Sequence, residues 1–115
     1  MSRGFVTFVV VGLFIVITLP KVYAFNAETT FNGVCAACHS IGQGKRVGPD
    51  LKGVTKRRQQ DWLIKFIKDP MGMVASDPVA KKLFDEYNKI PMPPQPTLKD
   101  GDIKAILDYI KKKSK

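Results

Sequence analysis

Two cysteines and one histidine stand within five positions of this 115-residue chain, in the stretch FNGVCAACHSI (31–41). Cys35, Cys38 and His39 are also its only residues of these two types. On a helix they occupy positions i, i+3 and i+4, so their side chains project from one face, about one turn apart. Sulfur and nitrogen ligands are therefore expected to act together at one site.

The order C-x-x-C-H is the attachment signature of a c-type haem. Two thioethers hold the porphyrin edge, and the imidazole one step further along lies under the iron. A domain of this size buries too little surface to be very stable alone, and a bound cofactor would act as a staple. We therefore predict one covalently attached haem c on Cys35, Cys38 and His39.

Four alternatives fit the same residues less well. Structural zinc needs four nitrogen or sulfur ligands, and the chain has three such side chains. A thioredoxin-like redox pair needs a βαβ context, which the sequence lacks. A disulfide between Cys35 and Cys38 would close too small a loop to constrain the unfolded chain much. Accidental clustering is the fourth.

The first 24 residues have the pattern of a signal peptide. Arg3 precedes a fifteen-residue apolar run (5–19), which is shorter than the about 20 residues that span a bilayer. Val22 and Ala24 fit the small-x-small cleavage rule. We expect a signal peptide at 1–24, a domain at 25–115 and a periplasmic location, with a retained N-terminal anchor as the alternative. Loss of the two basic residues before position 25 would lower the net charge from +9 to +7.

Four segments space their apolar residues as amphipathic helices do, and none alternates with the period of a β-strand. The last helix is expected to open at Thr97, with Asp100 as its partner in a capping box. The predicted fold class is all-α, with three to five helices. They are expected over residues 28–40, over residues 56–69, from Asp77-Pro78 to about Tyr87, and from Thr97 through a buried stripe of Ile103, Ile106, Leu107 and Ile110.

Three further segments are predicted to lack regular structure. Residues 41–54 are rich in glycine, and the segment PMGMVASDP (70–78) is expected to form a loose loop. Residues 90–96 carry four prolines around Met92, which favours a stiff extended loop. Long loops are therefore expected to wrap around the haem.

Beyond CAACH, the loop GPDLKG (48–53) and the pair Met92-Pro93 resemble the class I monohaem cytochrome c family, of the exported bacterial type. The resemblance extends from about Ala27 to Lys112. It implies a small cytochrome c fold in which the first and last helices cross. It also implies that Phe31, four residues before the first cysteine, packs against the last helix.

Met92 is the predicted second axial ligand of the iron. The resemblance implies it, because the family's methionine ligand lies in a loop shortly before the last helix. The residues favour it as well: with His39 used, a thioether is the best remaining neutral ligand. Prolines hold Met92 more rigidly than the glycine between Met71 and Met73 holds those two, which are expected to fill the core.

The resemblance implies three further haem contacts. The Pro49 carbonyl oxygen would accept the second ring N–H of His39 and fix its orientation. Trp62 and either Arg57 or Arg58 would bind a haem propionate, which needs a donor or a cation when buried. Core packing of Trp62 and solvated arginines are the alternatives.

A haem with both axial positions filled cannot bind substrate at iron, so the expected function is one-electron transfer, without enzymatic activity. The basic chain, with Lys45 and Arg46 next to the haem motif, favours redox protein partners with acidic docking patches. We expect a monomer or weak oligomer with no nucleic acid partner. Membrane contact is expected only through a retained N-terminal segment or membrane-bound partners.

Two other functions stay open. One is a dedicated haem subunit of a larger respiratory complex. The other is a haem ligand sensor or peroxidase, if Met92 is not bound to iron. A peroxidase usually has a distal acid-base group, most often histidine, and none remains once His39 is used.

Overall fold

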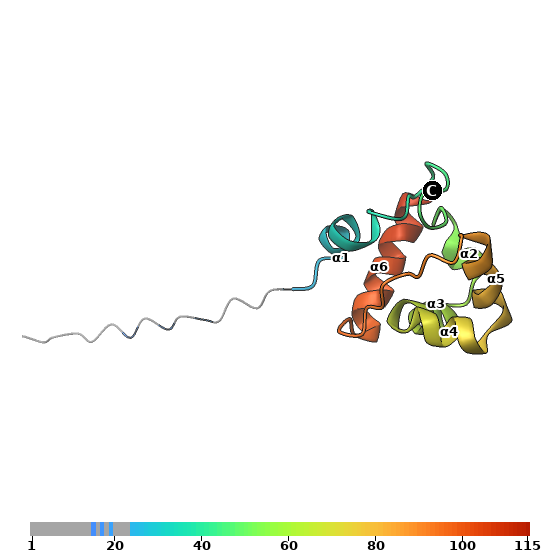
Figure 1. Cartoon of the computed structure of the whole chain (residues 1–115). Coiled ribbons are helices and arrows are strands. Elements are labelled where there is room, and N and C mark those ends of the chain that lie inside the picture. The colour runs from blue at the N-terminus through green and yellow to red at the C-terminus, as the bar shows by residue number, and fades with distance from the viewer. Residues whose placement is uncertain (1–14, 16, 18, 20–23) are drawn as a thin grey trace, which may run out of the picture.

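The computed structural model describes residues 15, 17, 19 and 24–115. The signal peptide predicted for residues 1–24 lies almost wholly outside them. The described part contains six α-helices, one π-helical turn and no strand (Figure 1). The all-α class is therefore confirmed, although the helices are more numerous than the three to five expected. They are α1 (Ala27–Thr30), η1 (Phe31–Cys35), α2 (Val54–Arg57), α3 (Gln60–Lys68), α4 (Pro70–Ser76), α5 (Pro78–Glu86) and α6 (Asp100–Lys113).

The core lies where α6 crosses the α1–η1 segment and packs on α3 (Figure 1). The Phe31 ring lies 5.5 Å from the Tyr109 ring of α6, centroid to centroid. The expected contact of Phe31 with the last helix is thus present. Each fully buried aliphatic side chain stabilises the fold by about 1.5–3 kcal/mol. The buried core residues are Phe31, Leu63, Ile64, Ile103, Ile106, Leu107 and Ile110, which include the whole predicted stripe of α6.

The first helix is shorter than the predicted 28–40. From Phe31 onward the turn widens, because the Ala36 N–H donates to the Phe31 carbonyl oxygen (2.9 Å) five residues back. Regular helix then ends at Cys35. Such single π-turns are frequent at functional sites. The rest of the CAACH motif follows the helix instead of lying in it.

The helix predicted over 56–69 is divided in two. Arg58 and Gln59 are extended and separate α2 from α3. The loop predicted over 70–78 is wrong, since α4 occupies most of it. The Asp69 side chain accepts the Gly72 N–H (3.0 Å) and caps α4, while Pro70 takes the first helical position, where a missing N–H is harmless. Pro70 therefore both ends α3 and begins α4.

The last two helices begin differently. α5 starts as predicted, because the Asp77 carboxylate accepts the Ala80 N–H (2.9 Å) and Pro78 is the first helical residue. α6 begins two residues later than predicted, since its N-cap is Lys99 instead of Thr97 and its first helical residue is Asp100. The Lys99 N–H donates to the Asp102 carboxylate (2.9 Å), so this pair replaces the predicted pairing of Thr97 with Asp100.

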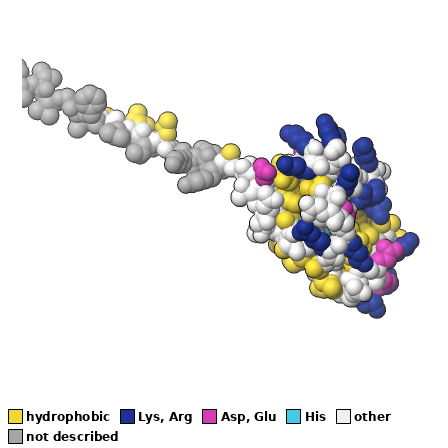
Figure 2. All heavy atoms as spheres, turned by 90° about the horizontal axis from the view of Figure 1, so that it is seen from above, with side chains coloured by type: hydrophobic (Ala, Val, Ile, Leu, Met, Phe, Trp, Pro, Cys, Tyr) yellow, Lys and Arg dark blue, Asp and Glu magenta, His cyan; other side chains and the backbone are white. Residues whose placement is uncertain are grey.

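The positive charge of the described domain is concentrated at one end. Residues 41–57 and 111–115 together hold nine Lys and Arg and one acidic residue, whereas residues 58–110 hold eight of each sign. The Gly53 N–H donates to the Ser114 hydroxyl (3.0 Å) and joins these two segments. We call them the basic end. Figure 2 looks onto the molecule from the side of the C-terminus and shows Lys and Arg side chains around this face.

Among the described residues, no helix combines the length and the apolar character needed to cross a bilayer.

Candidate functional site

Cys35, Cys38 and His39 form one tight turn directly after η1. The Cys38 and His39 N–H groups both lie within hydrogen-bond distance of the Cys35 carbonyl oxygen, at 3.2 and 3.0 Å. The turn therefore keeps the backbone of the three residues compact although the helix has ended. Both cysteines are free and half-buried. Burial raises the pKa of the Cys35 thiol.

The His39 ring is held by a hydrogen bond to the following loop. Its Nδ1 lies 2.8 Å from the Pro49 carbonyl oxygen. A carbonyl oxygen only accepts, so Nδ1 carries a proton, and in the neutral imidazole Nε2 keeps its lone pair. This is the bond that the resemblance implied for Pro49. It leaves Nε2 as the nitrogen able to bind a metal, in the orientation that such a bond usually fixes.

Gly48 lets the backbone pass directly over the His39 ring. A Cβ atom at this position would lie 2.4 Å from Cε1 and 2.8 Å from Nδ1 of that ring. No side chain larger than hydrogen fits there unless the ring moves. The GPDLKG pattern includes this glycine, but the contact itself depends on how two segments pack. Sequence reasoning therefore missed the role of Gly48.

The loop over His39 is organised by Asp50. Its carboxylate accepts three backbone N–H groups, from Gly42 and Lys52 (both 2.8 Å) and from Gly44 (2.9 Å). These bonds, with Gly42 foremost, lower the pKa of the Asp50 carboxyl. A single Asp in a glycine-rich loop is a common way to satisfy turn N–H groups. That pattern was visible in the sequence, but its role was not predicted.

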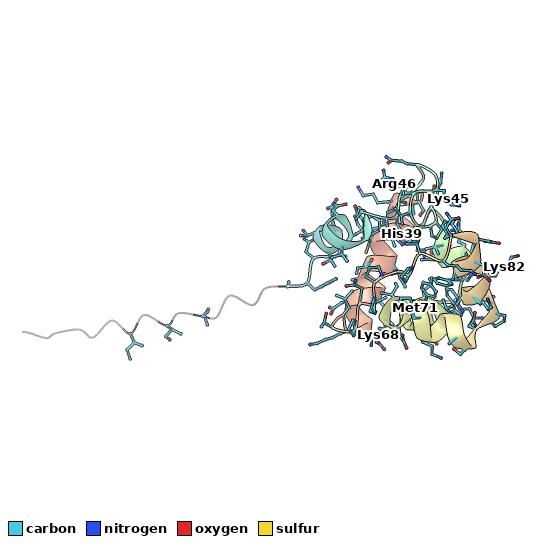
Figure 3. All side chains as sticks on the ribbon, viewed as in Figure 1. His39, Lys45, Arg46, Lys68, Met71 and Lys82 are labelled. Atoms are coloured by element: carbon cyan, nitrogen blue, oxygen red, sulfur yellow. The ribbon has the colours of Figure 1, made fainter. Side chains whose placement is uncertain are left out.

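The loop is also tied back to the CAACH turn. The Gly48 N–H donates to the Cys38 carbonyl oxygen (2.8 Å), and the buried Ser40 hydroxyl donates to the Gly44 carbonyl oxygen (2.6 Å). Figure 3 shows half-buried His39 below the loop that carries Lys45 and Arg46. The histidine and its supporting loop are therefore one connected unit.

Trp62 and Arg58 share a second cluster. The Arg58 guanidinium carbon lies 5.6 Å from the centre of the Trp62 ring, which stacks on Phe66 at 5.2 Å. The pKa of the nearby Asp77 carboxyl is lowered, most by the Ala80 N–H and less by the Trp62 indole. Half-buried Trp62 also packs against the core, so the packing alternative is at least partly correct.

Arg57 has different neighbours. Its guanidinium donates to the Lys52 carbonyl oxygen and to the Asp50 carbonyl oxygen, the second at 3.2 Å. The structure therefore groups Arg58, and not Arg57, with Trp62.

Met92 is half-buried in the irregular segment between α5 and α6. The Gln95 N–H ties this segment to α3 through the Ile67 carbonyl oxygen (3.0 Å). Met71 and Met73 lie on α4 instead of in a loop. Met71 is 44% exposed, so the expectation that it fills the core is wrong, while Met73 is half-buried.

Residues 25–114 match the family model for cytochrome c. The chain therefore belongs to the cytochrome c family. Cytochrome c-552 of Nitrosomonas europaea is 28% identical over 85 residues, which cover 74% of this chain and 75% of that protein.

Two solved cytochromes c have similar structures. A cytochrome c from Rhodothermus marinus is 34% identical with a TM-score of 0.69, over 76% of this chain and 73% of that one. The cytochrome c domain of the pp3183 protein from Pseudomonas putida is 34% identical with a TM-score of 0.66, over 77% of this chain and 88% of that one.

Membership in this family confirms three predictions: a class I c-type cytochrome, a small cytochrome c fold, and one covalently attached haem c. The residues present fit the group, since one turn offers two free thiols and an imidazole with an available Nε2. The protein is accordingly a haem-based electron carrier with redox protein partners. Cytochromes c are generally not enzymes, and bacterial ones are typically extracytoplasmic.

Proposed function

We propose that the protein is a periplasmic one-electron carrier that shuttles electrons between redox complexes, with His39 and Met92 as the two axial ligands of its haem iron. The observation that carries this proposal is the His39 ring, whose Nδ1 bonds to Pro49 and whose Nε2 keeps its lone pair. When bound, the haem supplies the iron that changes oxidation state. The chain positions it, excludes water and guides partners.

Met92 is supported as the second ligand by its surroundings. It lies half-buried between Pro91 and Pro93, whose rings restrict the backbone. A restricted thioether would move little when the iron changes oxidation state, which favours fast electron transfer. It would also occupy the position that substrate needs, so enzymatic activity is not proposed.

Trp62 and Arg58 are proposed to bind a haem propionate. They share one cluster, and Arg58 is half-buried, where a carboxylate needs such donors. Arg57 is proposed to support the loop over His39, because it donates to two backbone carbonyl oxygens of that loop.

The basic end is proposed as the region that draws partners. It contains nine Lys and Arg side chains and one acidic side chain, Asp50. The Asp50 carboxylate already accepts three backbone N–H groups. Elsewhere lysines pair with acids, as Lys68 does with Asp100 and Lys81 with Asp85. Uncompensated charge steers a protein toward acidic patches on partners. Small, weak contacts of this kind allow rapid turnover of a monomer or weak oligomer.

Location and processing complete the proposal. Residues 1–24 are proposed to act as a signal peptide, whose removal leaves a periplasmic domain of residues 25–115. The match to the family model begins at residue 25, which supports this boundary.

One spectral series tests the ligand assignment. The ferric protein should show the weak long-wavelength band of sulfur bound to iron. Met92→Ala should abolish that band, whereas Met71→Ala and Met73→Ala should keep it. A wild-type protein that lacks the band and binds carbon monoxide readily when reduced would contradict the carrier proposal.

A further inference from the structure

A cation–π contact joins the two segments that hold the proposed iron ligands. The Lys45 ammonium lies 4.3 Å from the centre of the Tyr87 ring, well within the range of about 6 Å at which such contacts attract. Lys45 comes six residues after His39, and Tyr87 comes five residues before Met92. The contact therefore connects the histidine side of the site with the methionine side.

Lys45 extends from a firmly held stretch of backbone. Its neighbour Gly44 accepts the Ser40 hydroxyl (2.6 Å), and the Arg46 N–H donates to the Gly48 carbonyl oxygen (3.0 Å). Gly48 in turn bonds to the CAACH turn and covers the His39 ring. The position of Lys45 is thus fixed relative to His39.

Tyr87 marks the beginning of the Met92 segment. After it the chain reverses through Asn88 and Lys89, both in the left-handed region at φ 58° and 56°. Two consecutive residues other than glycine in this region make an unfavourable turn, which needs support from its surroundings. The Lys89 N–H donates to the Phe84 carbonyl oxygen (2.9 Å), and the Ile90 N–H to that of Tyr87 (3.2 Å).

Few hydrogen bonds hold the backbone around Met92. Within the described residues its N–H group makes no hydrogen bond, and Pro91, Pro93 and Pro94 have none to offer. The segment is therefore anchored at its two ends, by the turn at Tyr87 and by the bond from Gln95.

Acidic residues near Tyr87 do not compete for Lys45. Asp85 pairs with Lys81 at 2.9 Å, and Glu86 lies 3.8 Å from Lys82. The aromatic face of Tyr87 is thus what Lys45 contacts at this end of α5.

We propose that Lys45 and Tyr87 are positioning residues for Met92. Their contact ties the Met92 segment to the loop that supports His39 and restrains its opening, and so restrains the replacement of Met92 by a small external ligand. This proposal rests on Met92 as the axial ligand, and it adds which residues keep that ligand in place.

The test is imidazole binding to the ferric, haem-loaded protein. Lys45→Met and Tyr87→Leu remove one partner each, and each should raise imidazole affinity about two- to fivefold, the factor that corresponds to an exposed cation–π contact. Lys45→Arg and Tyr87→Phe keep a cation and a ring, and should bind imidazole as the wild type does. Lys104→Met, which removes the same charge from an exposed position on α6, should also leave binding unchanged.

Two further measurements separate positioning from general stability. The double variant Lys45→Met/Tyr87→Leu should gain no more than either single variant, because both remove the same contact. Hydrogen exchange should accelerate in residues 88–95 and stay unchanged in α6. Wild-type affinity in both single variants, or additive effects with acceleration throughout the chain, would overturn the proposal. Absence of the sulfur-to-iron band from the wild type would instead overturn the ligand assignment.

Discussion

Replacing Gly48 by alanine should damage the site through a single methyl group. The added Cβ would lie 2.4 Å from Cε1 of His39 and 3.0 Å from Nε2. Carbon atoms make ordinary contacts from about 3.5 Å, so the ring and the methyl would have to separate by roughly 1 Å. Either the ring turns away from Pro49, or the loop lifts away from the CAACH turn.

The cost follows from what each movement breaks. Overpacking a well-packed position costs about 1–3 kcal/mol. Loss of the 2.8 Å bond between His39 and Pro49 adds about 0.5–1.5 kcal/mol. We therefore expect Gly48→Ala to lower the free energy of unfolding by about 2–4 kcal/mol. Turning the ring should also shift the reduction potential, since the bond to Pro49 tunes the basicity of the imidazole.

Denaturant titration of the haem-loaded protein measures this cost. The matched control is Gly33→Ala, in η1 only a few residues before His39, because a Cβ there meets no atom within 4 Å. That control should be unchanged or more stable by up to about 1 kcal/mol, as for other helical Gly→Ala changes. If Gly48→Ala unfolds at the same denaturant concentration as Gly33→Ala and keeps the wild-type potential, the contact between Gly48 and His39 does not limit the site.

Two other predictions concern charge. Backbone N–H groups lower the pKa of Asp50 in the folded protein, so its stabilisation is complete above the ordinary Asp pKa of about 3.9 and is lost as the pH falls through the lower folded value. Asp50→Asn should therefore be less stable than the wild type at neutral pH, with a gap that closes on acidification in urea titrations; a gap independent of pH would contradict this. For the basic end, Lys111→Gln/Lys112→Gln/Lys113→Gln should slow oxidation by the anion hexacyanoferrate(III) at low salt more than the control Lys65→Gln/Lys81→Gln/Lys104→Gln. The difference should vanish near 1 M salt, where the screening length is about 3 Å, and equal slowing in both variants would exclude a focused field at the basic end.

Features that depend on local spacing were predictable from the sequence. The α6 stripe of Ile103, Ile106, Leu107 and Ile110 is buried as expected, because helical periodicity alone determines which side chains share a face. The CAACH spacing likewise predicted the haem site, because all three attachment residues lie within five positions of the chain.

Features were not predictable where one residue type has two opposite structural effects. Pro70 breaks a helix at its interior but favours the first turn of one. The prediction used only the first property and missed α4, although Asp69 before it is a typical N-cap residue. The π-turn that ends the first helix at Cys35 has no comparable sequence pattern.

Contacts between distant segments also escaped prediction. Whether Arg57 or Arg58 joins Trp62 depends on the extended residues between α2 and α3, which turn the two side chains to different neighbours. The prediction of one continuous helix over residues 56–69 could not show that Arg57 and Arg58 have different neighbours.

The two sides of the site differ in how firmly they are built. His39 is enclosed by Gly48, bonded to Pro49 and backed by the three N–H groups that Asp50 gathers. This network is built mainly from hydrogen bonds within residues 35–52, and the Gly53 N–H joins its loop to Ser114 at the end of α6. Met92 has no such network, and its segment depends on contacts at its two ends. Substitutions on the two sides should therefore have different effects. Changes at Gly48 or Asp50 should alter the orientation of His39 and the stability of the fold. Changes at Lys45 or Tyr87 should alter how readily Met92 leaves the iron.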